Sequence, residues 1–153
     1  GVRVVTIMVG GRRGWDHHGD IKVAITQNAN VVDQATAALL TDLKRTGLLD
    51  STIVMWGGEF GRTPYAQNGN GRDHFAKGFT YWLAGGGVKK GIYYGETDEV
   101  GQNITKDPVH IHDLHATILH QMGLDHERLT FKYAGRDMTL TDVNAKVVSG
   151  VLA

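Results

Sequence analysis

Three apolar stretches of the chain predict buried β-strands. Residues 2–9 ("VRVVTIMV") are rich in β-branched side chains and contain almost no polar positions, which is typical of a strand covered on both faces. Residues 51–58 and 78–87 have the same character and end in glycines. A shorter strand or hairpin is expected within residues 92–101. The apolar pattern therefore predicts a sheet whose strands are separated along the chain by long polar segments.

Two further stretches predict helices between these strands. Residues 28–47 place apolar side chains at helical spacing and end in a basic pair and a glycine, the usual signals of a helix C-terminus. Residues 109–122 form the second expected helix. Strands that alternate with helices predict an α/β fold, with a mainly parallel sheet flanked by helices. Because ligands bind beyond the carboxyl ends of such strands, the polar loops at 10–22 and 57–77 are expected on one functional edge.

Composition narrows the classes of protein that this chain represents. Its 153 residues suffice for one domain, and residues 1–153 are interpreted as a single α/β domain or as the C-terminal portion of a larger one, because the sequence begins without Met inside an apparent strand. The formal net charge of zero argues against nucleic-acid binding. No apolar run approaches the roughly 20 residues of a membrane span. With no cysteine, any metal ligands would be His, Asp or Glu.

The first candidate site is the loop "GWDHHGD", residues 14–20. Asp16 and His18 are two positions apart, and their side chains can turn toward one cation; carboxylate and neutral imidazole suit Zn²⁺ or Mn²⁺. The alternative is a solvated turn. Within this loop, Asp16 and His18 are the predicted ligands, whereas His17 and Asp20 are assigned to the turn or to supporting contacts.

Two more clusters follow the later strands. In "GGEFGRTP", Glu59 comes directly after a strand and suits a metal ligand or a general base, and Arg62 suits a forked contact with a phosphate or sulfate oxygen. The alternative is that Glu59 and Arg62 pair with each other. In "GRDHF", Asp73 and His74 form a pair in which one residue binds metal while the other orients a neighbouring ligand. Three acid/histidine clusters at strand ends together predict a metal centre for ester hydrolysis.

The second predicted helix carries several histidines but is interpreted differently. Its apolar residues Leu114, Ile118 and Met122 recur at four-residue intervals, so it is first a packing helix. His110 and His112 are the weaker candidates for reaching the site. Serine is scarce, with only two residues in the chain, so a serine nucleophile from this chain is not expected.

Several motifs, in their order, resemble one bacterial family. "GWDHHGD", "VMWGGEFGRTP", "GRDHFAKGFTYWLAGGG" and "HDLHATILHQMGL" resemble the C-terminal half of the family called domain of unknown function 1501, which is similar to the alkaline phosphatase and sulfatase superfamily. The resemblance implies an alkaline phosphatase-like fold. It also implies metal binding by Asp16, His18 and His74, with Glu59 and Phe60 standing where the superfamily has an Asp-His pair. The superfamily's first metal-binding Asp and its nucleophile match nothing here; Thr63 is a local hydroxyl, but no motif assigns it a nucleophilic role.

The leading hypothesis is a metal-dependent hydrolase of phosphate or sulfate esters that acts on a small-molecule or glycan ester. Its metal ligands would be Asp16, His18 and His74, with Glu59 and Asp73 as further ligands or as residues that support them. The cofactor would be a divalent ion (Zn, Mn, Ca or Mg), and Arg62 the group near the substrate anion. The rival is a non-catalytic binding or structural domain that retains the hydrolase fold. A third interpretation is a carbohydrate-binding module built on the aromatic residues. The family resemblance implies a periplasmic or exported protein.

Overall fold

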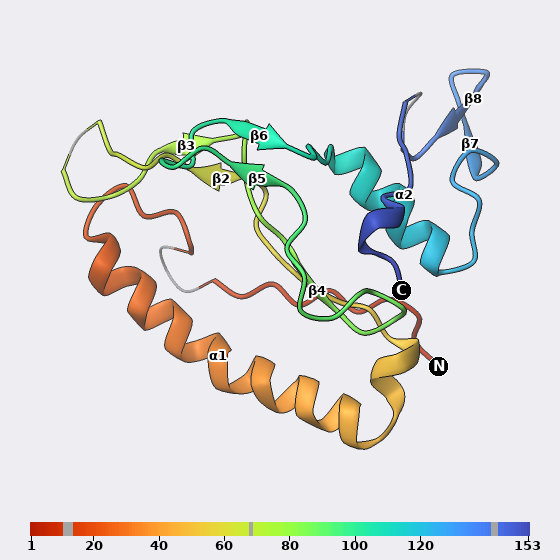
Figure 1. The fold of residues 1–153 in the computed structure, drawn as a ribbon, viewed down its shortest axis with the longest axis horizontal. Coiled ribbons are helices and arrows are strands. Elements are labelled where there is room, and N and C mark those ends of the chain that lie inside the picture. Colours follow the sequence, from red (N-terminus) through yellow and green to blue (C-terminus); the bar gives the residue numbers. More distant parts are fainter. Residues whose placement is uncertain (11–13, 68, 142–143) are drawn as a thin grey trace.

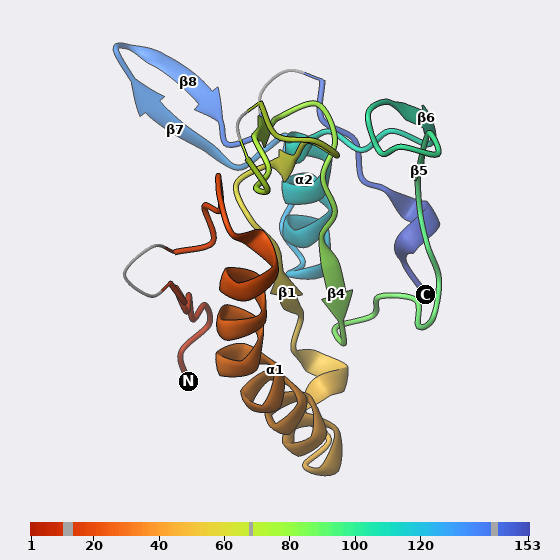
Figure 2. The same ribbon diagram turned by 90° about the vertical axis from the view of Figure 1, so that its left-hand side faces the viewer.

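The computed structural model describes residues 1–10, 14–67, 69–141 and 144–153, and over these residues the chain forms two α-helices and four pairs of short strands (Figure 1). In chain order the elements are α1 (Ile21–Arg45), η1 (Leu48–Ser51), β1 (Val54–Trp56), β2 (Gly61–Arg62), β3 (His74–Phe75), β4 (Trp82–Ala84), β5 (Glu96–Thr97), β6 (Ile104–Lys106), α2 (Ile111–Gln121), β7 (Thr130–Tyr133), β8 (Arg136–Thr139) and η2 (Ser149–Val151). Two views show the β7–β8 hairpin projecting from the rest of the molecule (Figures 1 and 2).

The predicted mainly parallel sheet, and with it the alkaline phosphatase-like fold, is wrong. Among the described residues, β1 pairs with β4, β2 with β3, β5 with β6 and β7 with β8, and every pair is antiparallel. Residues 2–9 form no strand, and Val2 and Met8 are 80% and 93% exposed. The apolar pattern predicts that a segment favours burial but does not specify its pairing partner. Here the two strands of each pair run in opposite directions, so they need no helical crossover between them.

The predicted helices are present with shifted boundaries. α1 begins at Ile21 rather than at residue 28, after Asp20 in the left-handed conformation (φ 50°). It ends at Arg45, and Gly47 follows with a φ of 75°, a backbone conformation that glycine adopts without steric cost. α2 agrees closely with the expected second helix. Among the described residues, no helix is both long enough and apolar enough to cross a membrane.

The described chain buries little apolar surface. Its accessible surface is 11,696 Å², half as much again as the roughly 7,600 Å² expected for a compact monomer of this mass. In the described part of the chain, Ala116 is the buried hydrophobic residue, and α1 contains no buried residue. Order around the candidate site therefore depends on backbone and polar contacts between loops more than on a large core.

Candidate metal centre

Two loops that are far apart in sequence lie against each other at the start of α1. The main-chain N–H of Arg72 donates to the carbonyl oxygen of His17 at 2.9 Å. Asp20 and Asn70 bond reciprocally: the Asp20 N–H donates to Asn70 Oδ1 at 2.7 Å, and Asn70 Nδ2 donates to Asp20 Oδ1 at 3.3 Å. At Gly71, an added Cβ would lie 2.0 Å from the carbonyl carbon of His18. Because glycine has no side chain, Gly71 allows the backbones of the two loops to approach this closely.

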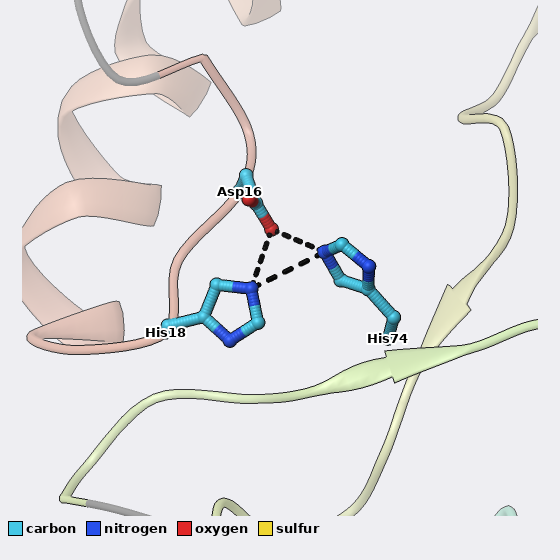
Figure 3. Close-up of side chains that lie close together, drawn as sticks. All are labelled: Asp16, His18 and His74. Carbon is cyan, nitrogen blue, oxygen red and sulfur yellow. Dashed lines mark hydrogen bonds and ion pairs between the residues drawn. The ribbon is translucent and has the colours of Figure 1, made fainter.

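This contact brings together three side chains that share one centre, Asp16, His18 and His74 (Figure 3). Asp16 Oδ1 lies 2.8 Å from His74 Nε2 and 3.1 Å from His18 Nε2, and the two Nε2 atoms are 3.2 Å apart. Figure 3 shows the three side chains pointing toward one another, the first two from the loop before α1 and His74 from β3. Each side chain is about half exposed, so the centre is open to solvent.

The triangle of donor atoms fits a small divalent ion. Tetrahedral ligands at about 2.0–2.1 Å from Zn²⁺ are about 3.3 Å apart, slightly more than the three observed separations of 2.8, 3.1 and 3.2 Å. An ion placed above the triangle would keep one coordination position free toward solvent. Two imidazoles and one carboxylate with an open fourth position are the donor set of catalytic zinc sites.

Arg62 and Glu59 lie beside the centre rather than within it. Arg62 Nη2 donates to Glu59 Oε1 at 3.3 Å, and Nη1 lies 3.3 Å from Asp16 Oδ1, an ion-pair distance. Nη1 is buried and makes no hydrogen bond with the described residues. The Phe60 ring contacts both His74 and Arg62. Its centroid lies 4.8 Å from the centroid of the His74 ring and 5.2 Å from the Arg62 guanidinium carbon. Glu59 and Arg62 therefore pair with each other, as the alternative interpretation of this loop expected.

The other predicted residues occupy supporting positions. Asp73 is not one of the three converging groups; its Oδ1 lies 3.3 Å from the outer nitrogen of His18, Nδ1. His17 is 6% exposed and faces α1, where its Nε2 lies 3.2 Å from Asn28 Nδ2. Thr63 is also 6% exposed, and its hydroxyl accepts from the Asp73 N–H and donates to a main-chain carbonyl. A hydroxyl held in this way is poorly placed to attack a substrate.

Electrostatics favour the ionised form of Asp16. The hydrogen bond with His74 holds the pKa of the Asp16 carboxyl below its ordinary value of 3.8. Burial opposes this as the second-largest influence, and the charges of His18, His74 and Arg62 lower the pKa further. Nearby, burial raises the pKa of Tyr81, and the charge of Glu59 raises it further. The centre therefore presents a stable carboxylate, the form in which Asp binds a metal.

Sequence reasoning missed two contacts that build the centre. The Asp20–Asn70 pair joins the loops, and the Phe60 ring supports His74. A glycine-flanked Asn in "NGNGRDH" and an aromatic residue directly after Glu59 are the sequence signals for them. Neither signal names a partner, because both partners are distant in sequence.

The site brings together two imidazoles, one carboxylate and an adjacent arginine, a group that could hold one metal ion. The chain belongs to the family described as "Protein of unknown function (DUF1501)", which matches residues 1–152. This confirms the family membership expected from the motifs. No curated protein and no solved structure matches the chain.

Proposed function

We propose that this chain is a metal-dependent hydrolase domain for phosphate or sulfate esters. The convergence of Asp16, His18 and His74 on one open centre carries the proposal. A divalent ion bound there, with zinc the best fit to the donor set, supplies a Lewis acid that polarises an ester oxygen. The resemblance of the loop motifs to those of alkaline phosphatases and sulfatases supports the same reaction class.

Arg62 gives the proposal its preference for anionic esters. A transferring phosphoryl or sulfuryl group carries negative charge over several oxygens, and fixed positive groups stabilise that charge. The Arg62 guanidinium is 3.3 Å from Asp16 and is held by Glu59 and by the Phe60 ring. Its Nη1 is buried beside Asp16 and makes no hydrogen bond with the described residues, so the guanidinium keeps its positive charge fixed next to the open centre. Arg62 is therefore proposed to bind the anion, and Glu59 to orient Arg62.

The rival function is a metal-binding domain without catalysis. It is favoured by the state of Thr63, whose hydroxyl is buried and makes two hydrogen bonds. This hydroxyl is therefore unsuited to act as a nucleophile. The two functions share the metal centre and differ in turnover.

The test measures metal content and turnover on the same purified protein. We expect about one divalent ion per chain, and hydrolysis of aryl phosphates or aryl sulfates that His74→Ala lowers by more than about 100-fold, because loss of a ligand exceeds the 10–100-fold effect of disturbing a supporting residue. His112→Ala, on α2, is the matched control and should retain activity. Bound metal with no turnover on either ester class would support the rival. Absence of bound metal at saturating Zn²⁺, Mn²⁺, Ca²⁺ and Mg²⁺ would reject both.

A further inference from the structure

We propose that Asp73 is a positioning residue that holds His18 in the tautomer and orientation needed for metal binding. This inference rests on the proposed metal centre and goes beyond it. Asp73 and His18 are 55 positions apart in sequence, and the pair forms because the Gly71 segment lies against the backbone of His18. The carboxylate then becomes the outer member of an Asp–His–metal arrangement, rather than a ligand.

The two nitrogens of His18 face different partners. Nε2 faces the centre, 3.1 Å from Asp16 Oδ1 and 3.2 Å from His74 Nε2, whereas Nδ1 lies 3.3 Å from Asp73 Oδ1. A neutral imidazole carries its proton on one nitrogen only. An ionised carboxylate accepts hydrogen bonds and cannot donate them. In the absence of metal, Asp16 Oδ1, 3.1 Å from Nε2, favours a proton on that nitrogen, and Asp73 favours the tautomer with the proton on Nδ1. That tautomer leaves the Nε2 lone pair available for the metal.

Asp73 is itself fixed, which is what a positioning role requires. Its Oδ2 accepts from the Gln67 N–H at 2.7 Å. Its main-chain N–H donates to Thr63 Oγ1 at 3.0 Å, and its carbonyl oxygen accepts from the Thr63 N–H at 2.9 Å. The Asp73 side chain is 23% exposed, against 52% for His18. With both carboxylate oxygens engaged and the backbone anchored on each side, Asp73 is placed to hold the more exposed imidazole.

The experiment compares Asp73→Asn with two controls in a Zn²⁺ titration against a competing chelator. Asn keeps the shape of Asp but offers one acceptor oxygen in place of two, so Asp73→Asn should weaken Zn²⁺ binding about 10–100-fold while one ion still binds. Asp98→Asn is the matched control, since Asp98 accepts similar loop hydrogen bonds from Gln102 and Asn103, and its affinity should be unchanged. Thr63→Val removes the acceptor of the Asp73 N–H and reports on loop anchoring alone.

Nitrogen NMR of the histidine side chains supplies a readout that loop damage alone would not produce. In the metal-free protein, the share of His18 with its proton on Nδ1 should be lower in Asp73→Asn than in the wild type, and Thr63→Val should leave this share unchanged. If the wild type fails to bind Zn²⁺, the metal centre is rejected. If it binds and Asp73→Asn binds equally well with the same His18 tautomer, only the positioning role is overturned. If Thr63→Val reproduces both effects of Asp73→Asn, Asp73 is a loop anchor and the inference is also overturned.

Discussion

Two regions of this protein are rich in histidine, and they use it in opposite ways. Around the candidate metal centre, His18 and His74 come from loops far apart in sequence and meet at 3.2 Å. In α2 and its N-cap, four histidines fall within eleven residues of sequence (His110, His112, His115 and His120), yet none belongs to a converging three-ligand group of the described residues. Density of histidine along the chain is therefore a poor guide to metal sites, because ligands must converge in space.

Of these four histidines, His110 stabilises the start of the helix. His110 is the N-cap: its Nδ1 accepts from the His112 N–H at 3.2 Å, while Asp113 Oδ2 accepts from the His110 N–H at 2.9 Å. This reciprocal arrangement satisfies N–H groups that the first helical turn leaves without partners. His115 and His120 are exposed on the helix surface. His18 and His74 are thus candidate ligands brought together by distant loops, whereas His110 stabilises the local start of a helix.

Removing one histidine from each region should give the largest difference in Zn²⁺ binding. His74→Ala should abolish Zn²⁺ binding measured by titration, because it removes one of three ligands, and should leave the helix signal in circular dichroism intact. His110→Ala should retain Zn²⁺ affinity and lower the free energy of unfolding in urea by about 1 kcal/mol, the typical value of an N-cap. Loss of Zn²⁺ binding in His110→Ala, or its retention in His74→Ala, would contradict the division between the two regions.

A second prediction concerns the close backbone contact at Gly71, which joins the two metal loops. Gly71→Ala would place a methyl group against the His18 backbone, forcing the loops apart at a typical overpacking cost of about 1–3 kcal/mol. We expect Zn²⁺ affinity to fall by more than about 10-fold, because two ligands lie on one loop and the third on the other. Gly19→Ala is the matched control, since a Cβ at Gly19 meets no atom within 4 Å. Equal affinity in the two variants would show that the close approach at Gly71 is not needed.

The sequence predicted the residues of the centre better than the architecture around it. Asp16, His18 and His74 were all expected, because each combines a metal-binding side chain with a loop after or before an apolar stretch. The sequence did not predict which acidic residues would converge on the centre and which would support the ligands. Whether Asp73 joins the three groups depends on which nitrogen of His18 it faces, and that is set by the contact across Gly71.

The fold prediction failed where pairing had to be inferred from composition. Residues 2–9 have the composition of a central strand, yet their side chains are largely exposed and they form no strand. Both helices were recognised, because helical spacing and capping are encoded within the segment itself. Strand pairing depends on a second segment, and β1 pairs with β4 in the antiparallel direction, a choice to which the apolar pattern of either segment is indifferent.

The smallest expected effect tests whether the centre acts as one unit without metal. Because the hydrogen bond from His74 lowers the Asp16 pKa, Asp16 contributes stability above its ordinary value of 3.8, and this is lost as pH falls through the lower folded pKa. In chelator-treated protein, carbon NMR of the Asp16 carboxyl should titrate below 3.8 in the wild type and at higher pH in His74→Ala. Arg62→Gln should produce a smaller rise, since Arg62 acts through charge alone and ranks last among the causes. A wild-type midpoint at or above 3.8, or no change in His74→Ala, would mean that these side chains do not interact until a metal joins them.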